Sequence, residues 1–296
     1  MIITAWLLAC LAMTTLSPSS ARHPEPPALI VPSTQIEMEK VLDIPYYTGV
    51  DADEKKHKLD LFLPKGKKNF PVLFFVHGGS WTSGDRKMYG NMGTVFTKHG
   101  LGVVVISYRL SPAITHPEHI VDVARAFDWT VKNISKYGGN TDEIFVSGHS
   151  AGAHLVSLLA TNGTYLKAHN LTAKNIKGVI PISGIYMVPE GVMTNVVGKS
   201  PGAALSASPT QHVTGKEPPM LVLYADQDFG GCGAMSKVFV EKLTNAKVSA
   251  TIEEITGRTH VSIMARILSS DADPASQLML TFIAKHTKGR PAGKAN

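Results

Sequence analysis

The stretch Gly148-His149-Ser150-Ala151-Gly152 decides the fold, because it joins two segments of different periodicity. Residues 144–146 before it are an apolar run typical of a strand, and residues 153–160 after it are typical of a helix. A Gly-x-Ser-x-Gly pattern at such a junction predicts a sharp turn, since the glycines lack the Cβ atoms that would collide there. The turn would lift the side chain of Ser150 clear of the sheet, and we predict that Ser150 is a nucleophile.

A second motif, His77-Gly78-Gly79-Ser80-Trp81, follows the apolar run 72–76. It strengthens the first motif, because Gly-x-Ser-x-Gly alone arises often by chance in a chain with 26 glycines. A glycine-rich loop at the end of a strand can aim backbone N–H groups at the place where negative charge develops during acyl transfer. We assign this oxyanion hole to the amides of Gly79, Ser80 and Ala151.

The other residues of the glycine motif are expected to support the loop. Gly78 is expected to serve the turn of the loop. His77 is interpreted either as a structural residue whose hydrogen bond holds the loop or as a more direct part of the site. Trp81 either packs under the loop or lines the acyl pocket, and its position in the sequence does not distinguish the two.

These motifs, with Tyr108-Arg109-Leu110-Ser111-Pro112 and Gly257-Arg258-Thr259-His260, resemble those of α/β-hydrolases of the esterase/lipase branch. Over residues 46–285 the chain is similar to hormone-sensitive-lipase-like carboxylesterases, kynurenine formamidases and feruloyl-esterase-like enzymes. The resemblance implies an α/β-hydrolase fold, with a mostly parallel central sheet of about eight strands, helices on both faces and a small cap. It extends to a superfamily branch and not to one substrate.

The resemblance implies a serine carboxylic-ester hydrolase that works through an acyl-enzyme on a small-molecule ester. Because the candidate cap is short, the site should be open and shallow, which favours short-chain or small aromatic esters. Two alternatives stay open. One is an arylformamidase-type amidase, which export from the cell would disfavour. The other is a non-catalytic hydrolase-fold binding module, although such proteins usually lack one of the three catalytic residues, the serine, the acid or the histidine.

The proton-transfer partners of Ser150 should come later in the chain, because this fold orders them as serine, acid and histidine. His260 follows the last predicted strand, precedes a helical pattern and matches the family's Gly-x-x-His loop. Asp226 and Asp228 both follow the predicted strand 220–224. The family's spacing assigns the acid to Asp228, and Asp226 is expected to cap the N–H groups of the turn.

Nearly unbroken apolar runs predict the strands of one parallel sheet that is buried between helices. They cover residues 72–76, 103–107, 144–147, 178–182, 220–224 and 248–254. Helical patterns such as residues 120–134 alternate with these runs, which implies right-handed crossovers. Residues 41–47 and 58–63 are expected to form an antiparallel pair of edge strands.

A chain of 296 residues is long enough for one α/β domain, which we place at residues 41–287. Residues 22–40 contain several prolines and predict a disordered or extended lead-in, and residues 288–296 form a basic tail. Residues 185–218 are rich in small and turn-forming residues. They form either a small cap or rim over the acyl site or a passive surface connection.

Residues 1–21 combine an apolar run with small residues near its end, which predicts a secretory signal peptide. The protein would then be secreted or periplasmic, with no stable membrane span after cleavage. Cys10 lies in a stretch that resembles a bacterial lipidation box, so a lipoprotein is the alternative. If Cys10 is removed with the signal, Cys232 is the only cysteine left and no intrachain disulfide can form.

Several classes of partner are not indicated by the sequence. The net charge of +6 comes from scattered lysines without interleaved aromatic residues, so nucleic-acid binding is not expected. No metal-binding motif occurs, and no cofactor is implied. Asp122, on the predicted helix after Arg109, is interpreted as an ion-pair or loop-anchoring residue. No motif indicates an oligomeric state.

Overall fold

The computed structural model describes residues 36–287. The predicted signal peptide at residues 1–21, most of the lead-in at residues 22–40 and the basic tail at residues 288–296 lie outside the described residues. Within residues 36–287, no helix has the length and apolar character that would be needed to cross a membrane.

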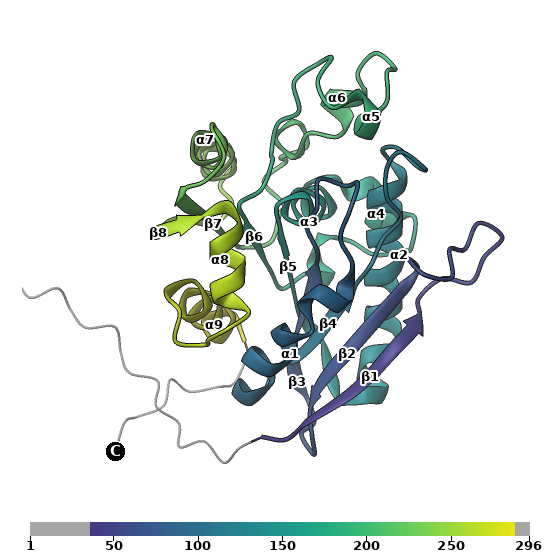
Figure 1. Cartoon of the computed structure of the whole chain (residues 1–296), viewed down its shortest axis with the longest axis vertical. Helices are drawn as coiled ribbons and strands as arrows, with labels where there is room; N and C mark the ends of the chain where they lie inside the picture. The colour runs from purple at the N-terminus through teal and green to yellow at the C-terminus, as the bar shows by residue number, and fades with distance from the viewer. Residues whose placement is uncertain (1–35, 288–296) are drawn as a thin grey trace, which may run out of the picture. The chain divides into compact units, whose positions relative to one another are not determined.

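Eight strands of the described chain form one sheet, in the order β1-β2-β4-β3-β5-β6-β7-β8 (Figure 1). The strands are β1 (Met38–Pro45), β2 (Lys58–Pro64), β3 (Phe70–Val76), β4 (Gly102–Ile106), β5 (Gly139–His149), β6 (Gly178–Ile182), β7 (Met220–Gln227) and β8 (Ala250–Thr259). β2 runs antiparallel to both β1 and β4, and the other neighbouring pairs are parallel. The predicted mostly parallel sheet of about eight strands is confirmed.

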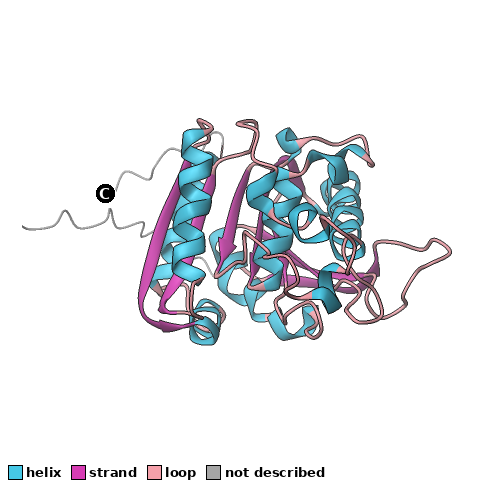
Figure 2. Cartoon of the chain, turned by 90° about the horizontal axis from the view of Figure 1, so that it is seen from above, coloured by secondary structure: helices cyan, strands magenta, loops and turns pink. Residues whose placement is uncertain are grey.

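Helices cover both faces of the sheet (Figures 1 and 2). The α-helices are α1 (Asn91–Phe96), α2 (Glu118–Asn133), α3 (Ala151–Thr161), α4 (Gly163–Lys167), α5 (Thr194–Val197), α6 (Ala203–Ser206), α7 (Cys232–Asn245), α8 (His260–Ile267) and α9 (Pro274–His286). Short 3₁₀ helices are Arg86–Tyr89, Thr97–His99, Ile134–Tyr137, Ala173–Asn175 and Pro209–Gln211. Strands and helices alternate from β3 onward, as the crossover pattern predicts.

The two helical layers bury alternate side chains of the same strands. On β3, Phe74 packs edge-on against Phe127 of α2, with ring centroids 5.6 Å apart, in the core that also holds α3 and α7. Its neighbours Leu73 and Phe75 belong to the opposite core, with side chains of α1, α8 and α9. A strand covered on both faces reads as a continuous apolar run, because residues pointing either way are buried.

Two expectations at the start of the chain were wrong. The first strand begins at Met38, not near residue 41, because its polar residues pair through their backbone with β2, as in Met38 with Pro64. Backbone pairing does not require apolar side chains, so the sequence shows no hydrophobic pattern that would mark the start of this strand. In addition, β2 is not an edge strand. It lies between β1 and β4, and its residues after Lys58 are buried, so β1 alone forms this edge of the sheet.

The carboxyl ends of the parallel strands meet at one edge of the sheet, where ligands bind in folds of this class. The glycine motif follows β3, Ser150 follows β5, Asp228 follows β7 and His260 follows β8. Parallel topology therefore brings together four loops that are far apart in the chain.

Candidate active site

Ser150 lies in the predicted turn between β5, which ends at His149, and α3, which begins at Ala151. Its backbone has φ 56° and ψ −117°, a conformation that costs a residue with a side chain on the order of 1–3 kcal/mol. A Cβ atom added to Gly152 would lie 2.1 Å from the carbonyl oxygen of Val76. The glycines therefore let the elbow press against β3, as the sequence predicts.

Asp228 and His260 form a close pair at this edge of the sheet. His260 Nδ1 lies 2.6 Å from Asp228 Oδ1. The Ser183 hydroxyl donates to Asp228 Oδ2 at 2.5 Å, and the backbone amides of Ala225 and Phe229 donate to the same carboxylate. Because the carboxylate can only accept, Nδ1 of His260 carries the hydrogen and Nε2 is left as the basic nitrogen.

The surroundings of Asp228 keep it ionised. Burial alone raises the pKa of this carboxyl, but the hydrogen bonds from His260, Ser183 and the two backbone amides outweigh burial and hold the pKa well below its usual range. A carboxylate that stays charged can stabilise an imidazolium that forms beside it.

Asp226 lies in a different environment. It is still within β7, which continues to Gln227, and its side chain accepts a hydrogen bond from the backbone N–H of Arg258 at 2.8 Å. Backbone hydrogen bonds from Gln227 and from Asp226 itself agree with the expected cap of its own turn, and Asp226 also holds the loop that leads to His260. The imidazole of His260 contacts Asp228, two residues further along the chain, which agrees with the sequence-based choice between the two carboxylates.

A cavity of about 370 Å³ brings the candidate residues together, since Ser150 and His260 both line it. Apolar side chains provide most of its wall: Trp81, Ile185, Met193, Val196, Phe229 and Met235. Ile185 and Val196 belong to the segment 185–218, as do Met193 and Asn195, which also face the cavity. These contacts favour the cap or rim over a passive connection.

The glycine loop after β3 is built from unusual backbone conformations. Gly79, Ser80 and Trp81 have φ values of 121°, 53° and 60°. Among the described residues, none accepts a hydrogen bond from the amides of Gly79, Ser80 or Ala151, so these three donors are available to a ligand. Free N–H groups in a strained loop beside the elbow are what an oxyanion hole requires.

Gly78 has a different role from the one expected. It is not among the residues with positive φ, so the turn itself does not require a glycine there. A Cβ atom at this position would lie 2.8 Å from the carbonyl oxygen of His149 and 3.2 Å from the Cβ atom of Ser150. Gly78 therefore allows the glycine loop to approach the elbow.

His77 supports the loop from below. Burial lowers the pKa of His77 to about 4, and its Nδ1 lies 2.7 Å from the carbonyl oxygen of Gly78. Its ring stacks on Tyr108, with centroids 4.4 Å apart. These contacts favour the structural interpretation of His77. Trp81 is buried against His154 of α3 and also lines the cavity, which favours the lining role over packing under the loop.

Three neighbours of the pair are not identified as functional by the sequence analysis. The ring of His149 lies beside His260, and its Nε2 is 2.8 Å from the His260 carbonyl oxygen. Ser183 has φ 52° and bonds Asp228. The Phe229 ring stacks on the His260 imidazole. Only Ser183 had a usable signal, because it directly follows the predicted strand 178–182.

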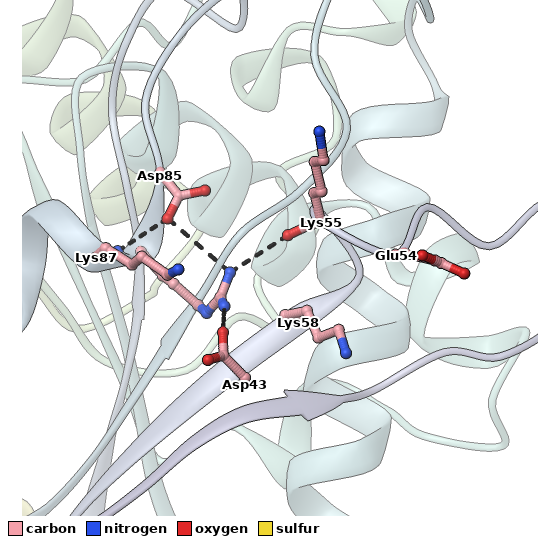
Figure 3. Close-up of a pocket in the computed structure, with 7 residues that line it drawn as sticks. Asp43, Glu54, Lys55, Lys58, Asp85 and Lys87 are labelled. Atoms are coloured by element: carbon pink, nitrogen blue, oxygen red, sulfur yellow. Dashed lines mark hydrogen bonds and ion pairs between the residues drawn. The ribbon is translucent and has the colours of Figure 1, made fainter.

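A second cavity, of about 360 Å³, is charged and lies in another part of the molecule (Figure 3). Its lining residues are Asp43, Glu54, Lys55, Lys58, Asp85, Arg86 and Lys87. The Arg86 guanidinium contacts Asp43, Asp85 and the carbonyl oxygen of Lys55. Figure 3 shows the Lys55 and Lys58 amines pointing in different directions, so they do not converge on one ligand. The ion pairs of Arg86 in this cavity therefore hold the segment after the glycine loop in place.

Other polar groups also have structural partners. As predicted, Asp122 anchors Arg109, accepting from its backbone N–H at 3.0 Å and from Nε at 2.9 Å. The Cys232 thiol is free and buried, and burial raises its pKa to about 12. Within residues 36–287, no group of three or more His, Cys, Asp or Glu side chains is arranged to hold a metal ion.

Comparison with known proteins places the chain in a family. The BD-FAE family model matches residues 59–243, which is more than half of the chain. The chain belongs to the BD-FAE family. Its α/β-hydrolase fold, predicted from the motifs, is confirmed by the sheet and by solved structures of esterases. One of these, a truncated carbohydrate esterase from gut microbiota, superposes with a TM-score of 0.73 at 20% identity over 84% of this chain and 96% of that one.

Two curated relatives of this BD-FAE member bear on its chemistry. Esterase LipQ of Mycobacterium tuberculosis is 34% identical over 69% of this chain and 52% of its own length. Kynurenine formamidase of Danio rerio is 24% identical over 83% of each chain. The chain spans about half the length of the mycobacterial esterases that it matches.

Proposed function

We propose that this BD-FAE member is a serine carboxylic-ester hydrolase that acts through an acyl-enzyme. One observation carries the proposal: Ser150, in a strained elbow, and His260, bonded to an ionised Asp228, line the same cavity. The named activities of its relatives support it. LipQ is an esterase, and LipM, another relative from Mycobacterium tuberculosis, is named a probable carboxylic ester hydrolase.

Acylation begins when Ser150 Oγ attacks the ester carbonyl carbon and its proton passes to His260 Nε2. Asp228 holds Nδ1–H and stabilises the imidazolium. The amides of Gly79, Ser80 and Ala151 donate to the oxyanion. When the intermediate collapses, the bond between the carbonyl carbon and the alcohol oxygen breaks, and Nε2–H protonates the departing oxygen.

Deacylation repeats these steps with water as the nucleophile. Nε2 of His260 takes a proton from water, whose oxygen attacks the acyl carbon, and the same donors hold the second oxyanion. The bond to Ser150 Oγ then breaks, and the serine oxygen recovers its proton from the imidazolium. The products are a carboxylic acid and an alcohol, and both side chains return to their starting states.

The size of the cavity supports the proposed substrate class. A space of about 370 Å³, walled in part by the short segment 185–218, suits short-chain or small aromatic esters. We expect para-nitrophenyl acetate and butyrate to have a higher kcat/KM than the palmitate ester. A higher kcat/KM for palmitate would contradict the proposed size limit.

The test of the serine mechanism is Ser150→Ala. It should lower kcat by at least about 10⁴-fold while leaving thermal unfolding unchanged, because removing a triad serine abolishes the acyl route. Thr82→Ala is the matched control, since this residue also lines the cavity and carries a hydroxyl but lies outside the proposed triad. A folded Ser150→Ala protein with near wild-type turnover would exclude Ser150 as the nucleophile.

An arylformamidase-type amidase is the second candidate, favoured by the match of the Danio rerio formamidase over most of both chains. It predicts faster hydrolysis of formanilide than of phenyl formate, relative to each compound's uncatalysed rate. The non-catalytic alternative predicts no release of chromophore from para-nitrophenyl acetate above background. An ester hydrolase instead releases nitrophenol and prefers the formate ester.

A further inference from the structure

Phe229 is an aromatic residue that contacts the proposed base, His260, and is exposed to solvent. Its ring centroid lies 4.0 Å from that of the His260 imidazole, with an angle of 27° between the planes. The side chain is 63% exposed and lines the cavity that contains Ser150. Because ligand cavities are lined mainly by apolar and aromatic side chains, a ring in this wall can contact a ligand bound beside Ser150 and His260.

The chemistry of ester cleavage decides which part of the substrate lies next to this ring. The departing alcohol oxygen must be within about 2.6–3.2 Å of His260 Nε2 to receive its proton. The acyl carbon is bonded to Ser150 and its oxygen points to the amides of the glycine loop. The alcohol part therefore lies beside the imidazole, and Phe229 is the aromatic residue that stacks on this imidazole.

The rest of the wall indicates the character of that alcohol. Gly230 lines the cavity next to Phe229 and adds no side chain, while Cys232 and Met235 follow on α7. Among the described residues that line the cavity, none is Lys, Arg, Asp or Glu. An uncharged, flat and polarisable group matches these surroundings better than a sugar or a charged alcohol.

We propose that Phe229 forms the alcohol subsite and selects esters whose leaving group is an aromatic alcohol, a proposal that rests on the serine esterase function. The phenol ring of the substrate packs on Phe229 while its oxygen receives the proton of His260. The aromatic preference is thus assigned to the alcohol side of the ester, and the acyl group stays short.

The experiment compares esters that vary one side at a time, by recording acid release at constant pH. Phenyl acetate and cyclohexyl acetate differ in the alcohol, and phenyl butyrate and phenyl acetate differ in the acyl group. The variants are Phe229→Leu, which keeps an apolar side chain, and Phe229→Tyr, which keeps the ring. Val238→Leu is the matched control, because Val238 is an exposed apolar residue of α7 that does not line the cavity.

In Phe229→Leu, the ratio of kcat/KM for phenyl over cyclohexyl acetate should fall about three- to tenfold, which corresponds to the loss of one aromatic pair. The ratio should be retained in Phe229→Tyr and Val238→Leu, and the butyrate-to-acetate ratio should not change in any variant. Comparing ratios removes the different intrinsic reactivity of the two alcohols and any general loss from a displaced imidazole.

Two results would overturn the alcohol subsite while leaving the esterase function intact. An equal fall for phenyl and cyclohexyl acetate would mean that Phe229 only supports His260. A change in the butyrate-to-acetate ratio would put the ring on the acyl side. If the wild-type protein hydrolyses none of these esters, the proposed function itself is wrong and the subsite with it. Thermal unfolding of each variant verifies that the exposed substitution leaves the fold intact.

Discussion

Two histidine–aspartate pairs of similar length lie in different parts of the molecule. His260 Nδ1 and Asp228 Oδ1 are 2.6 Å apart, and His57 Nε2 and Asp122 Oδ1 are 2.9 Å apart. The aspartate side chains are 3% and 0% exposed, so burial does not distinguish the pairs. Their other partners do, because Asp122 also contacts Arg109 and Arg125, whereas Asp228 is held by neutral donors.

The comparison shows that a histidine–aspartate contact alone is weak evidence for catalysis. Two guanidinium groups balance the charge of Asp122, and neither His57 nor Asp122 is among the residues that line the cavity with Ser150. Asp228 is ionised beside the imidazole of His260, which lines the same cavity as Ser150, the proposed nucleophile. The pair of His57 and Asp122 therefore has a structural role, and we propose proton transfer for the pair of His260 and Asp228.

The largest expected difference between the pairs is in turnover. Asp228→Asn should lower kcat by about 10⁴-fold, because the amide leaves the imidazole in the wrong tautomer. Asp226→Asn, assayed at equal folded concentration, is the matched control and should keep most of its rate per folded molecule. Inactivity of Asp226→Asn with an active Asp228→Asn would mean that the acid is assigned two residues too late.

The second difference is in stability. Asp122→Asn should lower the free energy of unfolding by about 3–5 kcal/mol, because it leaves Arg109 and His57 without their shared carboxylate. Denaturant unfolding measures this loss. The rate per folded molecule should stay near that of the wild type, and a selective collapse of kcat without a loss of stability would contradict the structural role.

The contact of His149 with the proposed catalytic pair should have a smaller effect. Its Nε2–H donates to the carbonyl oxygen of His260, so His149→Leu should lower kcat about 10- to 100-fold with little change in KM. His149→Gln, which can restore the donor, should recover most of the rate. His154 is the control, since its Nε2 contacts the carbonyl oxygen of Ala207, and His154→Gln should leave kcat per folded molecule near wild type. Equal losses in all three variants would contradict the positioning role.

The smallest expected effect is a loss of stability below neutral pH, caused by His149. Burial lowers the pKa of His149 to about 4, below the value of about 6.5 expected in the unfolded chain. As the pH falls below 6.5, the unfolded chain therefore binds a proton that the folded protein does not, and stability is lost until about pH 4. Between about pH 7 and 5, the wild type should lose about 2 kcal/mol more than His149→Gln in denaturant unfolding. Equal losses would contradict a neutral, buried His149.

Local patterns explain why so much of this site could be predicted from the sequence. The elbow around Ser150 and the glycine loop at Gly79 are defined by residues that are adjacent in the chain, and topology puts both at strand ends. The choice of Asp228 over Asp226 depended on a spacing of two residues, which family resemblance could supply. The apolar strands were visible because they are covered on both faces.

The remaining features depend on residues that only the fold brings together. The bond from His149 to His260 spans 111 positions, and the bond from Ser183 to Asp228 spans 45. Neither side chain belongs to a recognisable motif with its partner. Gly78 was misread for the same reason, because the atoms that exclude its Cβ belong to the elbow and not to its own turn.

The most direct test of the account is to trap the acyl-enzyme. The wild-type protein is mixed with para-nitrophenyl acetate, quenched in acid within the first turnover and digested for mass spectrometry. We predict a burst of nitrophenol and one acetyl group on the peptide that contains Ser150, both absent from Ser150→Ala. Rapid ester turnover with Ser150 unmodified, or with the acetyl group on another residue, would contradict the central claim.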